Sequence, residues 1–521
     1  MEKRNLKIDR RKNKITGELQ LIILFASLKL ILHLLVISNF ELHRDDYLYY
    51  AQSEHLAWGY FSAPPTVAII CKLATLIFGN TVFAIRFFPA LIGAFCIVII
   101  GLAIKELGGK KIAISLGSLS YLLSPSFLHT NYLLQPVCVE HFYWLLSTYL
   151  ILLLIKRNNP KILIWIGIVF GFGFINKYSM VFFVVAFAIS LLISQYRKLY
   201  LSKYFLFAIV AGLIIIFPNL LWQYLHNWPV LMHMSELHDT QLVNVKLSDY
   251  LFDQLLMNAH TIFLWITGLL VLLFYKKENQ YRIFGLICIF IVALIALGKG
   301  KSYYTLGLYP ILFIFGAYFT EKYIKKYLIY VSSFLVLFMF LGLYISFSFD
   351  GIPLMTFEKA LKEKAYRWED GDYHDLPQDM SDMTGWKDIG KTVNDIFLEL
   401  GTENKNNCNI FCYHYGQAGA VMFYGKKNNI PQPISFNGSF VFWSVDSLSK
   451  DYLIWVHSDL HNDFNPDSIL PKRFKKVTLK ATIDNRYFRE NGTKIYLCEY
   501  PTPEYKIYYA KLIKQYKNKY R

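Results

Sequence analysis

Apolar runs separated by short polar stretches fill the first two thirds of this 521-residue chain. A helix that crosses a membrane core of about 30 Å needs roughly 20 mostly apolar residues. Runs near that length predict about eleven spanning helices, at residues 20–38, 82–104, 111–129, 137–155, 161–175, 178–194, 204–222, 260–275, 283–298, 303–320 and 327–347. The pattern therefore predicts a membrane protein whose embedded part, residues 20–348, is all-α.

Two further stretches flank the first spans. Residues 64–79 are apolar but short and open with Pro64 and Pro65, so we predict a helix lying along the membrane surface. Residues 1–19 are basic, and no small-residue cleavage site follows the first run. We therefore predict an uncleaved first span with a cytoplasmic N-terminus.

The positions of Lys and Arg predict the orientation. Basic clusters occupy alternate connections, at residues 105–111, 156–161, 196–203, 276–282 and 321–327. Because cytoplasmic loops carry this excess, we place these connections inside, which requires the region 161–194 to cross twice. The first outer loop is then residues 39–81, and everything from residue 349 lies on the extracytoplasmic side of the inner membrane.

Composition agrees with this prediction. Hydrophobic residues make up 55% and aromatic residues 17%, which excludes a single soluble domain. A net charge of +17 could indicate nucleic-acid binding, but the basic residues lie between apolar runs and form no soluble face. The expected partner is the lipid bilayer, and no nucleic acid.

From residue 349 the pattern changes. A helical stretch at 386–400 is followed by short alternating apolar segments, which predict a soluble α/β domain over residues 349–521. Cys408 and Cys412 share one face of a predicted strand, too far apart to bond each other. A disulfide from one of them to Cys498 is left open.

An acidic pair, Asp45 and Asp46, directly follows the first span. Two adjacent carboxylates repel each other, so at least one could have a raised pKa suited to accepting a proton. The alternative is a solvated loop end. Tyr49 and Tyr50 add aromatic surface, which suits either a floor on which a sugar stacks or an interfacial belt.

Four cations lie at predicted outer helix ends, where the positive-inside rule does not explain them: Arg86, Lys177, Lys299 and Lys301. Such side chains could hold a phosphate at the outer membrane surface and stabilise negative charge on it. Snorkelling lysines are the alternative. Glu140, at the outer start of the fourth span, could face the same cavity or form a buried structural pair with His141.

The loop histidines match no familiar metal-ligand spacing. His226, His233 and His238 stand near Glu236 and Asp239. A metal site there is a weak hypothesis, and we predict no metal ligands.

Several of these residues occur in an ordered set of motifs. The strongest is DDYLYYAQSEHLAWGYFSAPPTVAIICKLATLIFGNTVFAIRFFPALIG, and LLSPSFL, GFINKYSM, PNLLWQYLHNWP and GKGKSYYTLGLYPIL follow it. Over residues 20–320 the chain resembles the dolichyl-phosphate-mannose protein mannosyltransferase-like family, glycosyltransferase family 39. The related aminoarabinose transferases also belong to the glycosyltransferase C superfamily.

The resemblance implies a bundle of about eleven spanning helices with juxtamembrane helices, and a reaction. A sugar would pass, with inversion, from a polyprenyl-phosphate donor to a glycan, lipid or protein acceptor outside the membrane. Asp45 would be the base, with Asp46 standing where the family usually has Glu. Whether a divalent metal, Mg²⁺ or Mn²⁺, is needed is left open.

Other roles follow from the same resemblance. Lys177, Lys301, Arg86 and Lys299 would contact the donor phosphate. A second departure is that Gln135-Pro136-Val137 stands where many relatives carry an acidic residue, so that Glu140, one turn later, is a candidate substitute. The pocket for donor and acceptor would be lined by aromatic residues of the motifs, namely Tyr49, Tyr50, His55, Tyr60, Tyr303 and Tyr304.

Two other functions compete with this interpretation. A transporter or flippase would use the same charges as a substrate pathway, but we find no paired inverted halves, and the candidates cluster at the outer surface. In a second alternative the membrane part only anchors residues 351–521. Replacing Asp45 separates these cases, since an anchor would tolerate the change.

Overall fold

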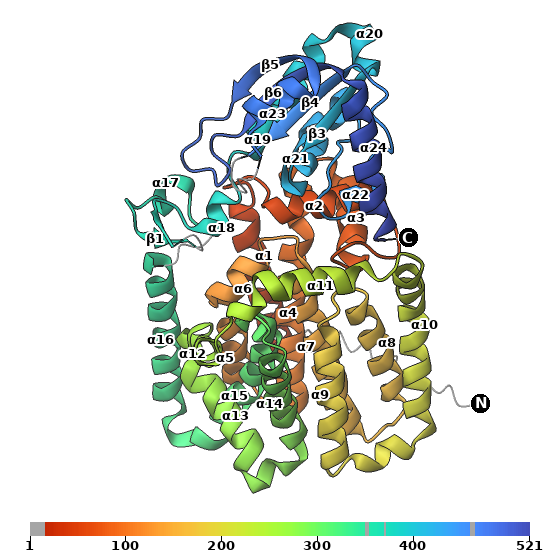
Figure 1. Cartoon of the computed structure of the whole chain (residues 1–521). Helices are drawn as coiled ribbons and strands as arrows, with labels where there is room; N and C mark the ends of the chain where they lie inside the picture. The colour runs from red at the N-terminus through yellow and green to blue at the C-terminus, as the bar shows by residue number, and fades with distance from the viewer. Residues whose placement is uncertain (1–15, 350–353, 369–370, 459–463, 521) are drawn as a thin grey trace, which may run out of the picture.

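The computed structural model describes residues 16–349, 354–368, 371–458 and 464–520. A helical bundle carries a sheet-containing domain at one end (Figure 1). The bundle consists of α1 (Gly17–Val36), α4 (Val82–Leu107), α5 (Lys111–Leu122), α6 (Pro125–Thr130), α7 (Pro136–Arg157), α8 (Ile162–Phe174), α9 (Met180–Ile193), α10 (Lys203–Leu225), α13 (Ile262–Phe274), α14 (Arg282–Leu297), α15 (Tyr309–Ile324) and α16 (Leu328–Phe349). A helix therefore forms in every apolar run that the sequence predicts to span.

The number of full-length spans is smaller than the number of runs. Within the described residues, six stretches are long and apolar enough to cross a membrane, or seven if the pair bent by 55° around Ala259 counts as one. The stretch Ser302–Ser346 holds both α15 and α16, which separate at Lys325, where φ is 35°. Helices α8 and α9 have 13 and 14 residues, only about 20 Å at 1.5 Å per residue.

One predicted span is divided in two. The run 111–129 breaks at Ser124, which caps α6 by accepting a hydrogen bond from the Phe127 N–H. Pro125 occupies the first helical position, where its missing N–H costs nothing, and it disfavours helical backbone at the residue before it. The prediction of one continuous helix there is wrong because the proline acts as a helix start.

Helix α15 is the centre of the bundle. Every residue from Tyr309 to Thr320 is buried, so the helix is enclosed on all sides. By contrast, α10 fully buries only Gly212, Asn219 and Gln223, and many of its apolar side chains are exposed. This inside-to-outside gradient is typical of a bundle whose solvent is lipid.

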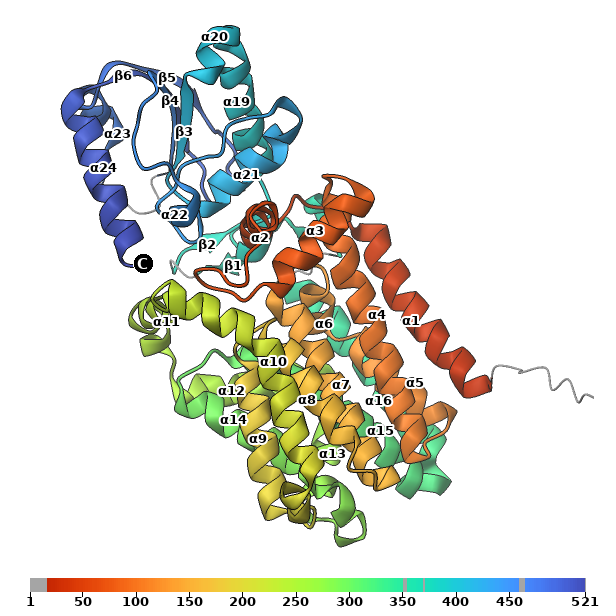
Figure 2. The ribbon, with the colours of Figure 1, turned by 90° about the vertical axis from the view of Figure 1, so that its right-hand side faces the viewer.

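Four further helices lie at the domain end of the bundle: α2 (Arg44–Glu54), α3 (Thr66–Phe78), α11 (Pro229–Thr240) and α12 (Leu247–Leu256). Helices α2 and α3 lie between the bundle and the domain (Figure 2). Helix α3 falls on the predicted surface run and is apolar on both sides. Its inner face buries Val67 and Cys71, whereas Leu76 and Ile77 are 70% and 62% exposed.

The C-terminal domain, which we define as the described residues from 354 on, contains a four-stranded sheet in the order β3-β4-β6-β5. Strands β3 and β4 are parallel, and the other pairs are antiparallel. Its elements are α17 (Phe357–Ala360), β1 (Tyr366–Arg367), β2 (Tyr373–His374), α18 (Gln378–Ser381), α19 (Trp386–Glu399), α20 (Gly401–Asn406), β3 (Cys408–Cys412), α21 (Tyr415–Gly425), α22 (Phe440–Trp443), β4 (Tyr452–His457), α23 (Pro466–Ile469), β5 (Phe474–Thr482), β6 (Lys494–Pro501) and α24 (Pro503–Asn518). The predicted class, a membrane helical bundle with an α/β part, is confirmed.

All seven cysteines are free thiols. Cys408 and Cys412 lie on β3 and Cys498 lies on β6, with β4 between the two strands. Strands two places apart are roughly 10 Å apart, beyond the Cα separation that a disulfide spans. The disulfide that the sequence leaves open is therefore absent.

The C-terminal domain shares a hydrophobic core with the first outer loop. One buried cluster joins Tyr47 and Ala51 of α2 to Trp386 and Ile410 of the domain. At Gly419 of α21 the two parts approach so closely that a Cβ would lie 2.5 Å from the Tyr47 carbonyl oxygen. The domain is therefore packed onto the loop that carries the acidic pair, and is more than a tethered appendage.

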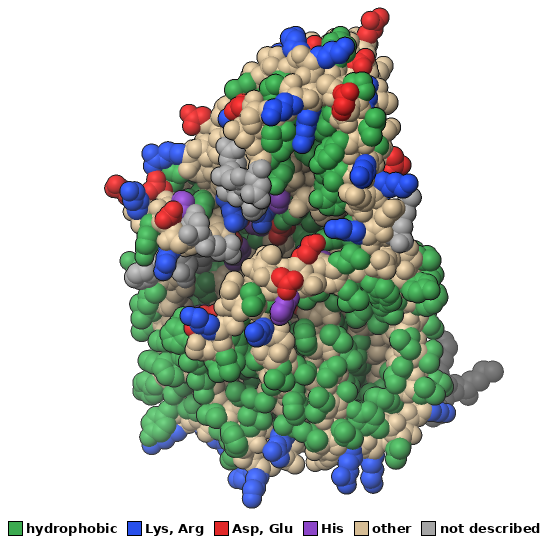
Figure 3. Space-filling view, in the orientation of Figure 1, with side chains coloured by type: hydrophobic (Ala, Val, Ile, Leu, Met, Phe, Trp, Pro, Cys, Tyr) green, Lys and Arg blue, Asp and Glu red, His purple; other side chains and the backbone are tan. Residues whose placement is uncertain are grey.

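Side-chain chemistry divides the surface into bands. Figure 3 shows hydrophobic side chains covering the bundle, Lys and Arg along its rim far from the domain, and mixed charges over the domain. An apolar belt edged by basic residues on one side is what the positive-inside rule expects of a membrane protein.

Candidate active site

The acidic pair forms the first turn of α2, where the two carboxylates have different surroundings. Asp46 is fully buried, and its Oδ2 accepts a hydrogen bond from the N–H of His43 at 3.1 Å, closing a capping box. Its Oδ1 accepts from the N–H of Leu134 at 3.1 Å. Asp46 therefore ties the start of α2 to the segment between α6 and α7, with both oxygens occupied.

Asp45 is more open. Its side chain is 30% exposed, and Oδ1 accepts a hydrogen bond of 2.6 Å from the hydroxyl of Tyr415. Oδ2 lies 3.5 Å from the amide nitrogen of Gln135, a marginal contact. The Nε of Arg44 lies 3.8 Å from Oδ1. Oδ2 thus keeps lone pairs that no strong donor occupies.

The pKa values of the two carboxyls shift in opposite directions. Burial would raise the pKa of Asp45, but His43, Arg44 and the Tyr415 hydroxyl together hold it below its ordinary value. Burial raises the pKa of Asp46 above its ordinary value. The ionised, accessible carboxylate is therefore Asp45.

A second charged cluster joins α7 to the turn between α8 and α9. Lys177 Nζ lies 2.7 Å from Oε2 of Glu140, and the Ser179 hydroxyl donates to Oε1. Glu140 is 3% exposed, whereas Lys177 is 20% exposed. The ammonium of Lys177 also lies 4.8 Å from the ring centre of Tyr304 and 5.8 Å from that of Tyr303.

Two tyrosines connect the clusters. Burial is the largest cause of the raised pKa values of Tyr303 and Tyr49. Both Asp45 and Glu140 also lie near enough to Tyr303 for their charges to raise its pKa, and Asp45 likewise raises the pKa of Tyr49. Tyr303 is 43% exposed and Tyr49 is half-buried. Asp45, Tyr49, Tyr303 and the Glu140–Lys177 pair therefore lie near one another at the domain end of the bundle.

Arg86 has a different setting from the phosphate contact that the sequence suggests. It is 1% exposed, and its guanidinium donates to the carbonyls of Ile37, Phe40 and Glu41 and to the hydroxyl of Tyr132. Carbonyls that follow the end of α1 attract a cation because they lie at the negative end of the helix dipole. Arg86 therefore fixes the start of the first outer loop.

The two remaining lysines lie in the connection before α15. Lys299 is exposed and has a left-handed backbone, with φ of 50°, whereas Lys301 is half-buried. Neither ammonium has a hydrogen-bond or ion-pair partner within the described ranges. Both remain available to an anion.

The other predicted pocket residues hold the loop to the C-terminal domain. Tyr50 is 1% exposed and packs edge-on against Phe423 at 5.1 Å. His55 stacks on Trp443 at 4.3 Å. Tyr60 is also 1% exposed, and its hydroxyl donates to the carbonyl oxygen of a loop residue, Gln52, at 2.9 Å. These side chains organise the loop and leave Tyr49, Tyr303 and Tyr304 nearer the charges.

Sequence reasoning missed two contacts of Asp45. Tyr415 lies 370 residues away in the C-terminal domain, and Gln135 stands out in the sequence only as part of a departure from the family pattern. No local periodicity links such distant positions, so only the assembled fold reveals them.

Among the described residues, one group has donor atoms close enough to hold a metal ion. Ligand atoms of His43, Asp379 and Asp382 lie within 4.8 Å of one another. Nδ1 of His43 accepts the Asp45 N–H, and Asp382 Oδ2 lies 2.8 Å from Arg489. Both groups are therefore already partly engaged.

The loop histidines do not join such a group within the described ranges. His226 stacks on Trp222 at 4.0 Å, and His233 packs edge-on against Phe61. His238 pairs with Asp239 at 3.1 Å, exposed to solvent. Their contacts are structural.

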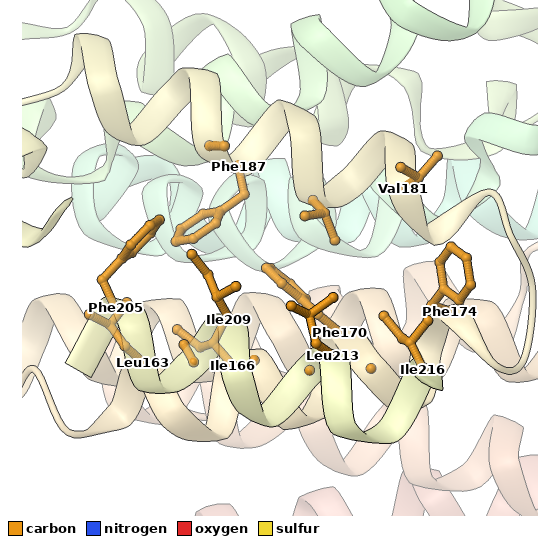
Figure 4. A pocket seen from close by; sticks show the side chains of 16 residues that line it. Leu163, Ile166, Phe170, Phe174, Val181, Phe187, Phe205, Ile209, Leu213 and Ile216 are labelled. Carbon is orange, nitrogen blue, oxygen red and sulfur yellow. The ribbon is translucent and has the colours of Figure 1, made fainter. Parts of the chain in front are cut away.

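An apolar cavity of about 300 Å³ lies between α8, α9 and α10 (Figure 4). Hydrophobic residues and glycines make up its entire lining. It runs from Leu163 and Phe205 to Phe174 and Val181, which flank the turn that carries Lys177. The cavity therefore extends along the bundle to a point beside the second charged cluster.

Comparisons with known proteins agree on one type of enzyme. Residues 62–222 match the family described as dolichyl-phosphate-mannose-protein mannosyltransferase. Over 194 residues the chain is 23% identical to the lipid A galacturonosyltransferase RgtD of Rhizobium johnstonii, an alignment that spans 37% of this chain and 41% of that relative.

Solved structures are similar over nearly the whole chain. ArnT from Cupriavidus metallidurans bound to undecaprenyl phosphate has a TM-score of 0.57 and 11% identity, covering 91% of this chain and 97% of ArnT. The apo form of ArnT has a TM-score of 0.60 and 12% identity, covering 92% and 98%. At this identity the likeness shows a shared fold over most of the chain.

Proposed function

We propose that this chain is a membrane-embedded glycosyltransferase of the C type that transfers a sugar from a polyprenyl-phosphate donor, which its fold and the family match over residues 62–222 support. The acceptor is a hydroxyl or phosphate of a glycan, lipid or protein on the extracytoplasmic side. One observation carries the proposal: Asp45 is an ionised, partly exposed carboxylate near the Glu140–Lys177 pair and the tyrosines beside it.

Asp45 serves as the general base for a hydroxyl acceptor. Oδ2 takes the proton as the acceptor oxygen attacks the anomeric carbon of the sugar. The bond from that carbon to the phosphate oxygen breaks, and polyprenyl monophosphate leaves with the bonding electrons. Attack opposite the leaving group inverts the anomeric centre, and Asp46, with both oxygens engaged, positions α2.

The phosphate of the donor binds near Lys177, Lys301 and Lys299. Cations there stabilise the charge that develops on the leaving phosphate. Glu140 holds Lys177 in place at 2.7 Å, which orients the ammonium before the donor arrives. The apolar cavity beside this cluster has the chemistry to take part of the prenyl chain, and the undecaprenyl phosphate bound to the ArnT structure supports a donor of this class.

The proposed site lies at the domain end of the bundle. The basic rim lies at the opposite end, and by the positive-inside rule it faces the cytoplasm (Figure 3). On this orientation, donor and acceptor meet outside the membrane.

The test is sugar transfer by the purified full chain in nanodiscs. Polyprenyl phosphates carrying mannose, glucose, galactose, galacturonic acid or aminoarabinose are supplied in turn, with glycan, lipid and peptide acceptors. Transfer from one donor that disappears in Asp45→Asn and persists in Asp395→Asn, an exposed aspartate on α19, supports the proposal. Donor binding without turnover in any reaction would favour a transporter.

A further inference from the structure

The C-terminal domain contributes a side chain to the candidate site. We propose that Tyr415 is a positioning residue that orients Asp45 for catalysis, so that the domain is an integral part of the active site. This inference rests on the proposed role of Asp45 as base.

The contact is short and its donor is fixed. The Tyr415 hydroxyl donates to Asp45 Oδ1 at 2.6 Å, the range of charge-assisted O–H···O bonds. Tyr415 is the first residue of α21, and the preceding His414 caps the helix by accepting the N–H of Gly416 at 3.1 Å. Burial raises the pKa of Tyr415 far above its usual range, so the hydroxyl keeps its proton.

Helix α21 packs closely against α2 before and after Asp45. A Cβ on Gly416 would meet the side chain of Arg44 at 2.7 Å, and Gly419 lies directly on the backbone of Tyr47. One turn further, the hydroxyls of Tyr424 and Tyr47 lie 3.1 Å apart. The separation of Tyr415 and Asp45 is therefore set by backbone packing.

The hydrogen bond from Tyr415 fixes the orientation of the Asp45 carboxylate. With Oδ1 held by Tyr415, Oδ2 is directed toward the side where Gln135 lies, 3.5 Å away. The guanidinium of Arg44 lies only 3.8 Å from Oδ1. Without the hydroxyl, the carboxylate is free to rotate into a closer ion pair with Arg44, which would occupy the lone pairs that the acceptor needs.

This arrangement predicts an effect on turnover and none on donor binding. The lysines proposed to hold the phosphate belong to the bundle and its connections, and no contact of Tyr415 in the described chain reaches them. A positioning role therefore lowers kcat and leaves KM for the donor unchanged. A merely structural role would lower the amount of folded enzyme and leave kcat per folded molecule intact.

The experiment compares Tyr415→Phe with Tyr424→Phe, each as the full chain in nanodiscs. Both changes remove one hydroxyl from α21 at the same interface, but only the first touches Asp45. We expect Tyr415→Phe to lower kcat about 10- to 100-fold, the scale of one hydrogen bond to a charged group, with unchanged donor KM. Tyr424→Phe should keep kcat within about twofold, and melting temperatures check folding.

Asp45→Asn, assayed in parallel, separates the two proposals. Loss of turnover in Asp45→Asn together with full kcat in Tyr415→Phe overturns the role of Tyr415 and leaves the proposed base. Full turnover in Asp45→Asn overturns the proposed base and with it the role of Tyr415, whereas no transfer by the wild-type enzyme from any donor overturns the proposed function itself. Equal losses of kcat in Tyr415→Phe and Tyr424→Phe would assign the effect to the interface and contradict a specific role of Tyr415.

Discussion

The two carboxylates of the candidate site, Asp45 and Glu140, differ in how their oxygens are used. Glu140 is 3% exposed, and both its oxygens are engaged, by Lys177 and Ser179. Asp45 is 30% exposed, and its Oδ2 has only two long contacts, with Gln135 at 3.5 Å and with His43 at 4.0 Å. A carboxylate whose oxygens are both paired can orient a cation, whereas one with an unpaired oxygen can accept a proton. The same chemical group can therefore serve two purposes in one site.

The largest effect on activity should come from replacing Asp45, the carboxylate with a weakly paired oxygen. Asp45→Asn keeps the size of the side chain but cannot accept a proton, so we expect kcat to fall about 10²- to 10⁴-fold, the usual contribution of a general base. Donor affinity, measured by binding of the labelled lipid, should stay within a few fold. Asp395→Asn is the matched control, and a similar loss in that variant would remove Asp45 from the mechanism.

Breaking the ion pair between Glu140 and Lys177 should give a smaller effect, on donor binding more than on turnover. Glu140→Gln keeps an acceptor for Ser179 but leaves Lys177 without its counter-charge. We expect KM for the donor to rise roughly tenfold with a smaller change in kcat, because a mispositioned ammonium binds phosphate less well. Steady-state kinetics at varied donor concentration measure both.

The double variant Glu140→Gln with Lys177→Met sharpens this test. It removes both charges, so it should recover part of the thermal stability lost in Glu140→Gln while binding donor still more weakly. Recovery of donor KM along with stability would mean that the pair is only structural.

Arg86 and Lys177 offer the same comparison among cations. The single ammonium nitrogen of Arg86→Lys cannot reach all the acceptors that the two terminal nitrogens of the guanidinium serve, so we expect the variant to lose about 2–3 kcal/mol of stability. The molecules that remain folded should keep the wild-type donor KM. A raised donor KM at an unchanged melting temperature would instead indicate that Arg86 contacts the donor phosphate.

The smallest effect concerns the apolar cavity. Ile209→Trp adds bulk to its lining, whereas Leu206→Trp changes a residue of α10 outside the lining. If the cavity takes part of the prenyl chain, Ile209→Trp should raise KM several-fold for a long-chain donor and leave a short-chain donor unaffected. Equal behaviour of the two tryptophan variants would argue against prenyl binding there.

Hydrophobic patterning predicted the fold well because helices in lipid must satisfy their backbone internally and bury or expose long apolar runs. It failed at residues 111–129, where Pro125 starts a new helix inside an apolar run. The region 161–194 does form two helices, α8 and α9, as the alternation of basic loops required.

The site was only partly predictable. Asp45 and Lys177 stand in recognisable motifs, but the identities of their partners depend on packing between distant segments. The sequence could not reveal that the guanidinium of Arg86 donates to carbonyls at the end of α1. Nor could it reveal that the carboxylate of Asp46 accepts a hydrogen bond in a capping box. The contact of Tyr415 with Asp45 could not be predicted from the sequence, because it joins two distant parts of the chain that pack against each other.

The most direct test of the central claim is the anomeric configuration of the transferred sugar, measured by NMR on the product while released polyprenyl phosphate is quantified. We predict inversion relative to the donor and one polyprenyl monophosphate released for each sugar transferred, both abolished in Asp45→Asn. Retention of configuration, or transfer that continues in that variant, would contradict a single displacement with Asp45 as the base.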